Sequence, residues 1–143
     1  MKKLFLLFTV IFICMSCEDK TPNFTTVFET SNGTKTPTYN EVIEFYKQLA
    51  DSYSSIHIQA IGETDSGEPL HLVTLNPDSN FNCESIRNDK RILLINNGIH
   101  PGESDGIDAT MLLFRDLVQG KMKMPKNVVL ATIPVYNIGG SLN

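Results

Sequence analysis

The sequence predicts an α/β domain built on a mixed sheet that is covered by helices. Three observations indicate this fold class. Strand-like and helical patterns alternate along the chain, two apolar runs have the length of buried strands, and the segment joining those runs has helical periodicity. A strand, a helix and a second strand in that order favour parallel pairing through a crossover connection. A hairpin ahead of them adds antiparallel strands, so the predicted sheet is mixed.

The first half of the predicted domain is a helix followed by a hairpin. The segment Thr38-Tyr39-Asn40-Glu41 has the spacing of a capping box, and apolar residues then recur at helical spacing to about Ser52. Residues 56–60 and 70–75 alternate between apolar and polar types. Because residues 64–67 between them have turn composition, we expect a β-hairpin.

The second half is a strand, a helix and a strand. Residues 91–96 form a continuous apolar run, which predicts a strand covered on both faces. Ser104 or Asp105 is suited to begin the next helix, and Gly120 is suited to end it. Residues 128–133 form another apolar run and are predicted to be the last strand.

Composition limits the classes of partner. The chain has 143 residues, of which 41% are hydrophobic and 20% charged, with a formal net charge of −4. Lys and Arg are scattered rather than clustered, so there is no electrostatic footprint for nucleic acid, and no nucleic acid is expected as a partner. Four strands make a thin sheet, and we therefore expect an incomplete, N-terminal portion of a larger domain.

The N-terminus has the pattern of an export signal. Lys2 and Lys3 precede an apolar stretch, residues 4–13, that is too short to span a membrane. Ser16-Cys17 then resembles the lipobox of bacterial lipoproteins, although Cys14 stands where Leu or Val is usual. The alternative is an ordinary secretory signal cleaved nearby. We expect Cys17 to be lipidated and to attach the mature chain to a membrane.

These patterns divide the chain into three parts. Residues 1–16 are interpreted as a lipoprotein signal peptide, residues 17–36 as a tether, and residues 37–143 as the domain portion. Phe24, Val27 and Phe28 are apolar residues within the tether that are suited to dock on the domain. Glu18-Asp19 resembles the acidic export tag of surface lipoproteins. The expected location is therefore outside the cytoplasm, anchored to a bacterial membrane, in particular the outer membrane.

The residues best suited to chemistry follow the strand at residues 91–96. His100 and Glu103 are separated by Pro101-Gly102, which favours a tight turn. Imidazole nitrogen and carboxylate oxygen both bind zinc well. Taken by itself, this spacing also fits an exposed loop histidine and a glutamate that stabilises the start of a helix.

The wider context favours the metal site. Four segments carry a resemblance: residues 39–49, 61–70, 96–103 and 133–137. In their order and spacing they resemble the zinc metallocarboxypeptidases related to carboxypeptidase A. The likeness covers roughly residues 36–143, with Glu68 where that family usually has Arg, and Asn137-Ile138-Gly139-Gly140 where Asn-Pro-Asp-Gly is common.

The resemblance implies a three-layer α/β/α fold around a mixed sheet. It implies a Zn²⁺ ion held by His100, Glu103 and a later histidine, with a later glutamate as general base. It also implies a metallocarboxypeptidase, a hydrolase that removes C-terminal residues from peptides or proteins. In such chemistry the metal activates water and polarises the scissile carbonyl.

The later residues are missing from the sequence. No histidine follows His100. His57 and His71 each lie between apolar residues of the predicted hairpin and are expected to face solvent. We therefore expect a fragment that lacks the third zinc ligand and the general base, binds zinc poorly and is inactive alone.

Two other functions stay open. One is a non-catalytic, surface-anchored binding module or remnant on the same scaffold. The other is a zinc deacylase of the aspartoacylase type, a group similar in fold that shares an H-x-x-E zinc segment. Those deacylases are usually cytosolic, so the lipoprotein signal argues against them.

Overall fold

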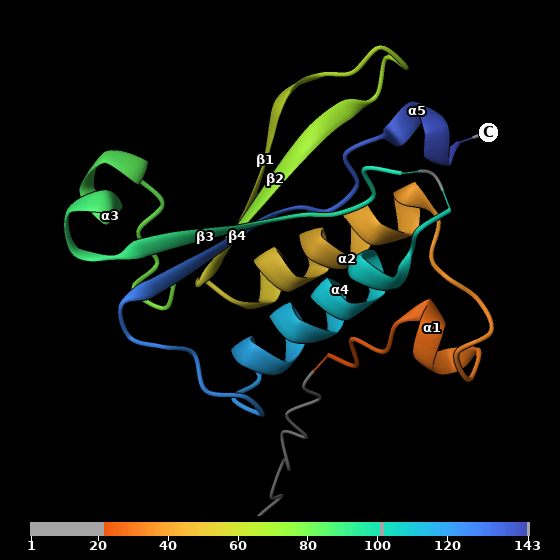
Figure 1. Cartoon of the computed structure of the whole chain (residues 1–143). Coiled ribbons are helices and arrows are strands. Elements are labelled where there is room, and N and C mark those ends of the chain that lie inside the picture. The colour runs from red at the N-terminus through yellow and green to blue at the C-terminus, as the bar shows by residue number, and fades with distance from the viewer. Residues whose placement is uncertain (1–21, 101, 143) are drawn as a thin grey trace, which may run out of the picture.

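The computed structural model describes residues 22–100 and 102–142. The predicted signal peptide, residues 1–16, and the predicted lipidation site, Cys17, lie outside this part. No helix in the described ranges has the length and apolar character that a membrane span needs. The elements are α1 Val27–Thr30, α2 Tyr39–Ser52, β1 Ile56–Glu63, β2 Pro69–Leu75, α3 Cys83–Asp89, β3 Arg91–Asn96, α4 Asp105–Val118, β4 Val128–Ile133 and α5 Ile138–Ser141 (Figure 1).

The four strands form one mixed sheet in the order β1-β2-β4-β3. The pairs β1–β2 and β2–β4 are antiparallel, whereas β3–β4 is parallel across the crossover helix α4. The predicted mixed sheet, hairpin and parallel pair are thus confirmed. The register of β1 against β2 shifts once, between Ala60 and Gly62.

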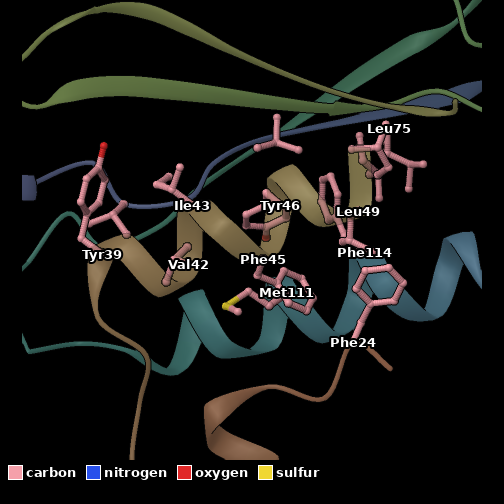
Figure 2. Packing of buried hydrophobic residues seen from close by; sticks show 14 of the residues in the cluster. Phe24, Tyr39, Val42, Ile43, Phe45, Tyr46, Leu49, Leu75, Met111 and Phe114 are labelled. Atoms are coloured by element: carbon pink, nitrogen blue, oxygen red, sulfur yellow. The ribbon is translucent and has the colours of Figure 1, made fainter. Parts of the chain in front are cut away.

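The helices α2 and α4 lie side by side on one face of the sheet and build the core (Figure 1). Val42 and Leu49 of α2 and Phe114 of α4 have no exposed surface. The ring of Tyr46 meets that of Phe114 edge-on, with centroids 5.6 Å apart. Figure 2 shows these side chains filling the space between the two helices and the sheet. Burial of such large apolar side chains is the main favourable term in folding.

The helix at Tyr39–Ser52 begins as predicted. The Thr38 hydroxyl accepts a bond from the Glu41 amide, and the Glu41 carboxylate accepts one from the Thr38 amide. The short helix α1 was not predicted, although Thr26 and Glu29 form the same capping box. Its signal was present in the sequence, at the same Thr-x-x-Glu spacing.

The segment before α2 packs against the domain. Phe24 is 4% exposed, and its ring lies against Phe45 and Tyr53. The guanidinium of Arg115 on α4 donates to the Phe24 carbonyl at 3.1 Å and forms an ion pair with Glu29. Of the three residues expected to dock, Phe24 is buried, whereas Val27 is partly exposed and Phe28 is 39% exposed.

The prediction that residues 91–96 are covered on both faces is wrong for the described part of the chain. The side chains of Ile92, Leu93 and Leu94 are 44%, 54% and 54% exposed. Successive side chains of a strand point to opposite faces of the sheet, and the described residues leave both faces of β3 partly uncovered. β3 is also the last strand of the sheet and pairs with β4 alone. An apolar strand is thus left at an open edge, a situation that folded proteins usually avoid.

Candidate metal centre

The candidate site lies on the turn between β3 and α4, residues 97–104. Gly98 and Gly102 have φ values of +61° and +84°, a left-handed backbone that suits glycine. A side chain at Gly98 would press on Ile107 and Val135, both 3.3 Å away. The turn is therefore held closely against α4 at its beginning, while Gly102 at its outer end faces open space.

His100 and Glu103 point toward one another across this turn. The imidazole Nδ1 lies 3.2 Å from Glu103 Oε2, and the side chains are 67% and 71% exposed. Two ligands of one tetrahedral zinc ion, each about 2.0–2.1 Å from it, are separated by about 3.3 Å from geometry alone. The observed separation thus suits a shared cation, and it also suits a direct hydrogen bond. The nature of the two donors fits zinc.

The described residues supply no third ligand. Nowhere in residues 22–100 and 102–142 do three His, Cys, Asp or Glu side chains gather so that they could hold a metal ion. His57 stacks on Phe81, with ring centroids 5.0 Å apart, and His71 contacts the Tyr39 hydroxyl at 3.2 Å. Burial lowers the pKa of His71, and the charge of Lys47 lowers it further.

The expectation that both hairpin histidines face solvent therefore needs correction, because each is only partly exposed. The alternation placed His57 correctly, because it pairs with Thr74 on the face away from the core, where Phe81 stacks on it. For His71 the prediction is wrong: it lies on the same face as the buried Val73 and Leu75, where it contacts Tyr39 of α2. Neither histidine joins His100 and Glu103.

A small pocket of about 160 Å³ adjoins the candidate ligands. One wall is the start of α2, with Thr38 and Tyr39, and another is the turn itself. Val135 and Ser141 close a third side, and sequence reasoning did not anticipate their place here. The α4 N-terminus beside the pocket favours negative charge. A larger hollow of about 690 Å³ lies elsewhere, beside Phe24 and Arg115, and its one carboxylate, Glu29, is paired with Arg115.

The fold and this turn define an α/β protein with an exposed imidazole–carboxylate pair at the carboxyl end of a parallel strand, where such sheets place their ligands. A family profile described as zinc carboxypeptidase matches residues 42–140. The chain belongs to the zinc carboxypeptidase family, whose members are hydrolases, and the resemblance found in the sequence is confirmed.

Two solved structures show the same fold. Carboxypeptidase A from Helicoverpa armigera is similar with a TM-score of 0.64 at 17% identity, over 74% of this chain and 25% of that one. Thrombin activatable fibrinolysis inhibitor is similar with a TM-score of 0.57 at 22% identity, over 78% and 31%. This chain thus spans about a quarter to a third of those proteins. No curated protein matches.

Proposed function

We propose that this chain contributes part of the active site of a zinc carboxypeptidase that hydrolyses C-terminal peptide bonds. The observation that carries the proposal is the convergence of His100 and Glu103, 3.2 Å apart, in a chain of the zinc carboxypeptidase family. In this proposal both side chains hold Zn²⁺. The third ligand and the general base come from residues outside this sequence, since no histidine follows His100.

The residues of this chain have defined tasks in such a reaction. His100 and Glu103 would hold the metal at the rim of the sheet, where their exposure leaves room for a peptide to approach. When bound, zinc supplies a Lewis acid for the scissile carbonyl. The two donors lie 3.2 Å apart, and the neighbouring pocket offers space beside them.

Zinc titration tests the metal assignment. We expect the full chain to bind one Zn²⁺ weakly, because two protein ligands leave two tetrahedral positions to water. His100→Ala and Glu103→Gln should each abolish binding in isothermal calorimetry. His57→Ala is the matched control, since His57 stacks on Phe81 and should not affect zinc. Equal zinc binding by wild type and His100→Ala would remove the assignment.

The proposed enzyme is exported and lipid-anchored. This part rests on the sequence of residues 1–17, with its two lysines, apolar stretch and Ser16-Cys17. Labelling with a palmitate analogue in a bacterial host should mark the wild type and spare Cys17→Ser. Labelling that persists in Cys17→Ser would contradict lipidation at this residue.

A non-catalytic binding module is the second candidate, favoured by one observation: the described residues lack a third metal ligand. The two candidates separate when the chain is assayed together with the missing segments of its domain. Release of C-terminal residues from a peptide, lost in His100→Ala, supports the enzyme. Peptide binding without hydrolysis in the same preparation supports the module.

A further inference from the structure

Three buried polar side chains stand directly behind the β3–α4 turn. Asn97, Thr110 and Thr132 are only 6%, 4% and 0% exposed. The Asn97 amide donates to the Thr110 hydroxyl at 3.0 Å and to the Thr132 hydroxyl at 3.2 Å. Buried polar groups are costly unless they are paired, so these hydrogen bonds favour one arrangement of the elements that they join.

The donor and acceptor roles in this cluster are determined by the Thr132 hydroxyl. The Thr132 hydroxyl donates its single proton to the Ile95 carbonyl at 2.9 Å. It can therefore only accept from Asn97, and the NH₂ group of Asn97 must face it. A carboxylate in place of this amide would bring an acceptor against an acceptor. The cluster thus requires an NH₂ donor at position 97, and a side chain of the same size without this donor does not suffice.

The cluster joins the two ends of the candidate metal site. Asn97 is the residue at which β3 passes into the turn, and Thr110 lies on the helix that follows it. The start of α4 has no side-chain cap, because Ser104 is in a helical conformation and makes no capping bond. A Cβ added to Gly106 would come within 2.9 Å of Asn97 Oδ1, which shows how closely α4 approaches this amide.

The backbone of the same residue secures the other side of the turn. The Asn97 amide donates to the Ile133 carbonyl at 3.1 Å, and the Asn97 carbonyl accepts from Tyr136 at 2.8 Å. Asn97 is therefore bonded to β4, to the segment after β4 and to α4. His100 and Glu103 lie on the short loop between this anchor and the helix.

We infer that Asn97 is a positioning residue for the metal site: its buried amide, held by Thr110 and Thr132, fixes the beginning of the turn relative to α4 and so sets the separation of His100 and Glu103. The inference rests on the proposed zinc function. Asn97 itself contacts no metal and no substrate.

The experiment follows the three histidine imidazoles by NMR during Zn²⁺ titration of the full chain. His100 reports binding, and His57 and His71 serve as internal references. Asn97→Asp and Thr132→Val, which keep the side-chain shapes, should weaken zinc binding at His100 about tenfold, the lower end for residues that orient metal ligands. Thr132→Ser keeps the hydroxyl and should restore binding to the wild-type value.

Two further variants separate positioning from stability. Asn76→Ala removes another buried asparagine, 1% exposed, at the opposite end of the sheet. It should lower stability and leave the zinc affinity unchanged. Gly106→Ala should favour helix formation yet weaken zinc binding, because the new methyl group displaces the Asn97 amide. Zinc affinity that follows stability across all these variants would overturn the inference.

Amide hydrogen exchange provides a readout that needs no metal. The amides of Asn97, Tyr136 and Asn137 should exchange at least about tenfold faster in Asn97→Asp, relative to the β1–β2 hairpin, because their bonds secure the turn. If zinc shifts no His100 signal in the wild type, the zinc function fails, and exchange alone decides the role of Asn97. Unchanged exchange in a folded variant would then refute it.

Discussion

Apolar side chains are buried in one region of this molecule and exposed in another. Between α2 and α4, Leu49 and Phe114 are fully buried, and the space between the helices and the sheet is filled (Figure 2). On β3, Leu93 and Leu94 are each 54% exposed, although four consecutive residues of this strand, 92–95, are apolar. The described part of the chain covers one region and leaves the other open.

The difference shows what an apolar pattern predicts. It predicts that a segment is suited to burial, but the residues that would bury it need not lie in the same stretch of sequence. Val42 and Phe114 find their partners within the described residues. The residues of β3 do not, in a chain that spans 25% to 31% of the solved structures it resembles. We therefore expect the two regions to respond differently to the same kind of mutation.

The largest effect should come from the closed region. Phe114→Ala removes a ring that has no exposed surface, and we expect it to lower the free energy of unfolding by about 3–5 kcal/mol. Leu93→Ala on the open strand should cost less than about 1 kcal/mol, because half of that side chain already contacts solvent. Urea denaturation of both variants measures the contrast. Equal losses in the free energy of unfolding would show that burial does not distinguish the two regions.

A second prediction concerns Arg115, which holds the N-terminal segment against α4. Arg115 is 9% exposed and joins Glu29 and the Phe24 carbonyl to α4. Arg115→Met should lower stability by about 2 kcal/mol, less than for a fully buried pair because Glu29 is partly exposed. Limited proteolysis should also cut residues 22–36 sooner. Unchanged proteolysis would show that Phe24 alone holds the segment.

The same ion pair predicts a dependence on pH. The hydrogen bond from Arg115 lowers the pKa of Glu29 below its usual 4.5, against a smaller opposing effect of burial. The ionised carboxylate therefore adds stability above pH 4.5, and this stability is lost as the pH falls toward the lowered pKa. Glu29→Gln should be less stable than wild type at pH 7 and approach it near pH 3. A constant difference would exclude Glu29 as the cause.

Ionisation of Asp108 should change stability with pH in the opposite sense to that of Glu29, and by less. Burial raises the pKa of this carboxyl above 3.8, and its Oδ1 has no hydrogen-bond partner among the described residues. Its ionisation therefore costs stability as the pH rises through the raised pKa. Asp108→Asn retains an acceptor for Thr36 and should gain up to about 1 kcal/mol at pH 7. Thermal unfolding at pH 4 and pH 7 should show the gain only at the higher pH.

The smallest effect on stability should come from a charge on the open strand. Leu93→Lys should change the free energy of unfolding by less than about 0.5 kcal/mol, as for other exposed positions. It should nevertheless reduce self-association, because a lysine on an edge strand discourages pairing with other chains. Light scattering against concentration measures this, with Lys121→Leu as a control away from the sheet edge. Equal self-association of wild type and Leu93→Lys would show that the molecules do not associate through β3.

The sequence was a reliable guide where local chemistry decides the structure. The Thr38–Glu41 box and the apolar spacing after it predicted α2 closely. Gly120 adopts the left-handed conformation expected just beyond α4. The turn composition of residues 64–67 predicted the hairpin. In each of these places, neighbours within a few residues supply the interactions.

The sequence was a poor guide where distant contacts decide. It did not show that β4 would lie between β2 and β3 or that β3 would lie at an edge. It did not identify Asn97 as part of a buried cluster, because Thr110 and Thr132 are 13 and 35 residues away. The candidate ligands His100 and Glu103 were predicted because residues 96–103 resemble the zinc-binding segment of a known family; their three-residue spacing alone also fits an exposed loop.

The irregular register of β1 has a consequence for larger proteins built on this unit. A bulge interrupts the even row of amide and carbonyl groups that an incoming strand needs as a template. β1 has such an interruption between Ala60 and Gly62, whereas β3 pairs with β4 through six residues without a break. We therefore expect a further strand to add beside β3 rather than beside β1.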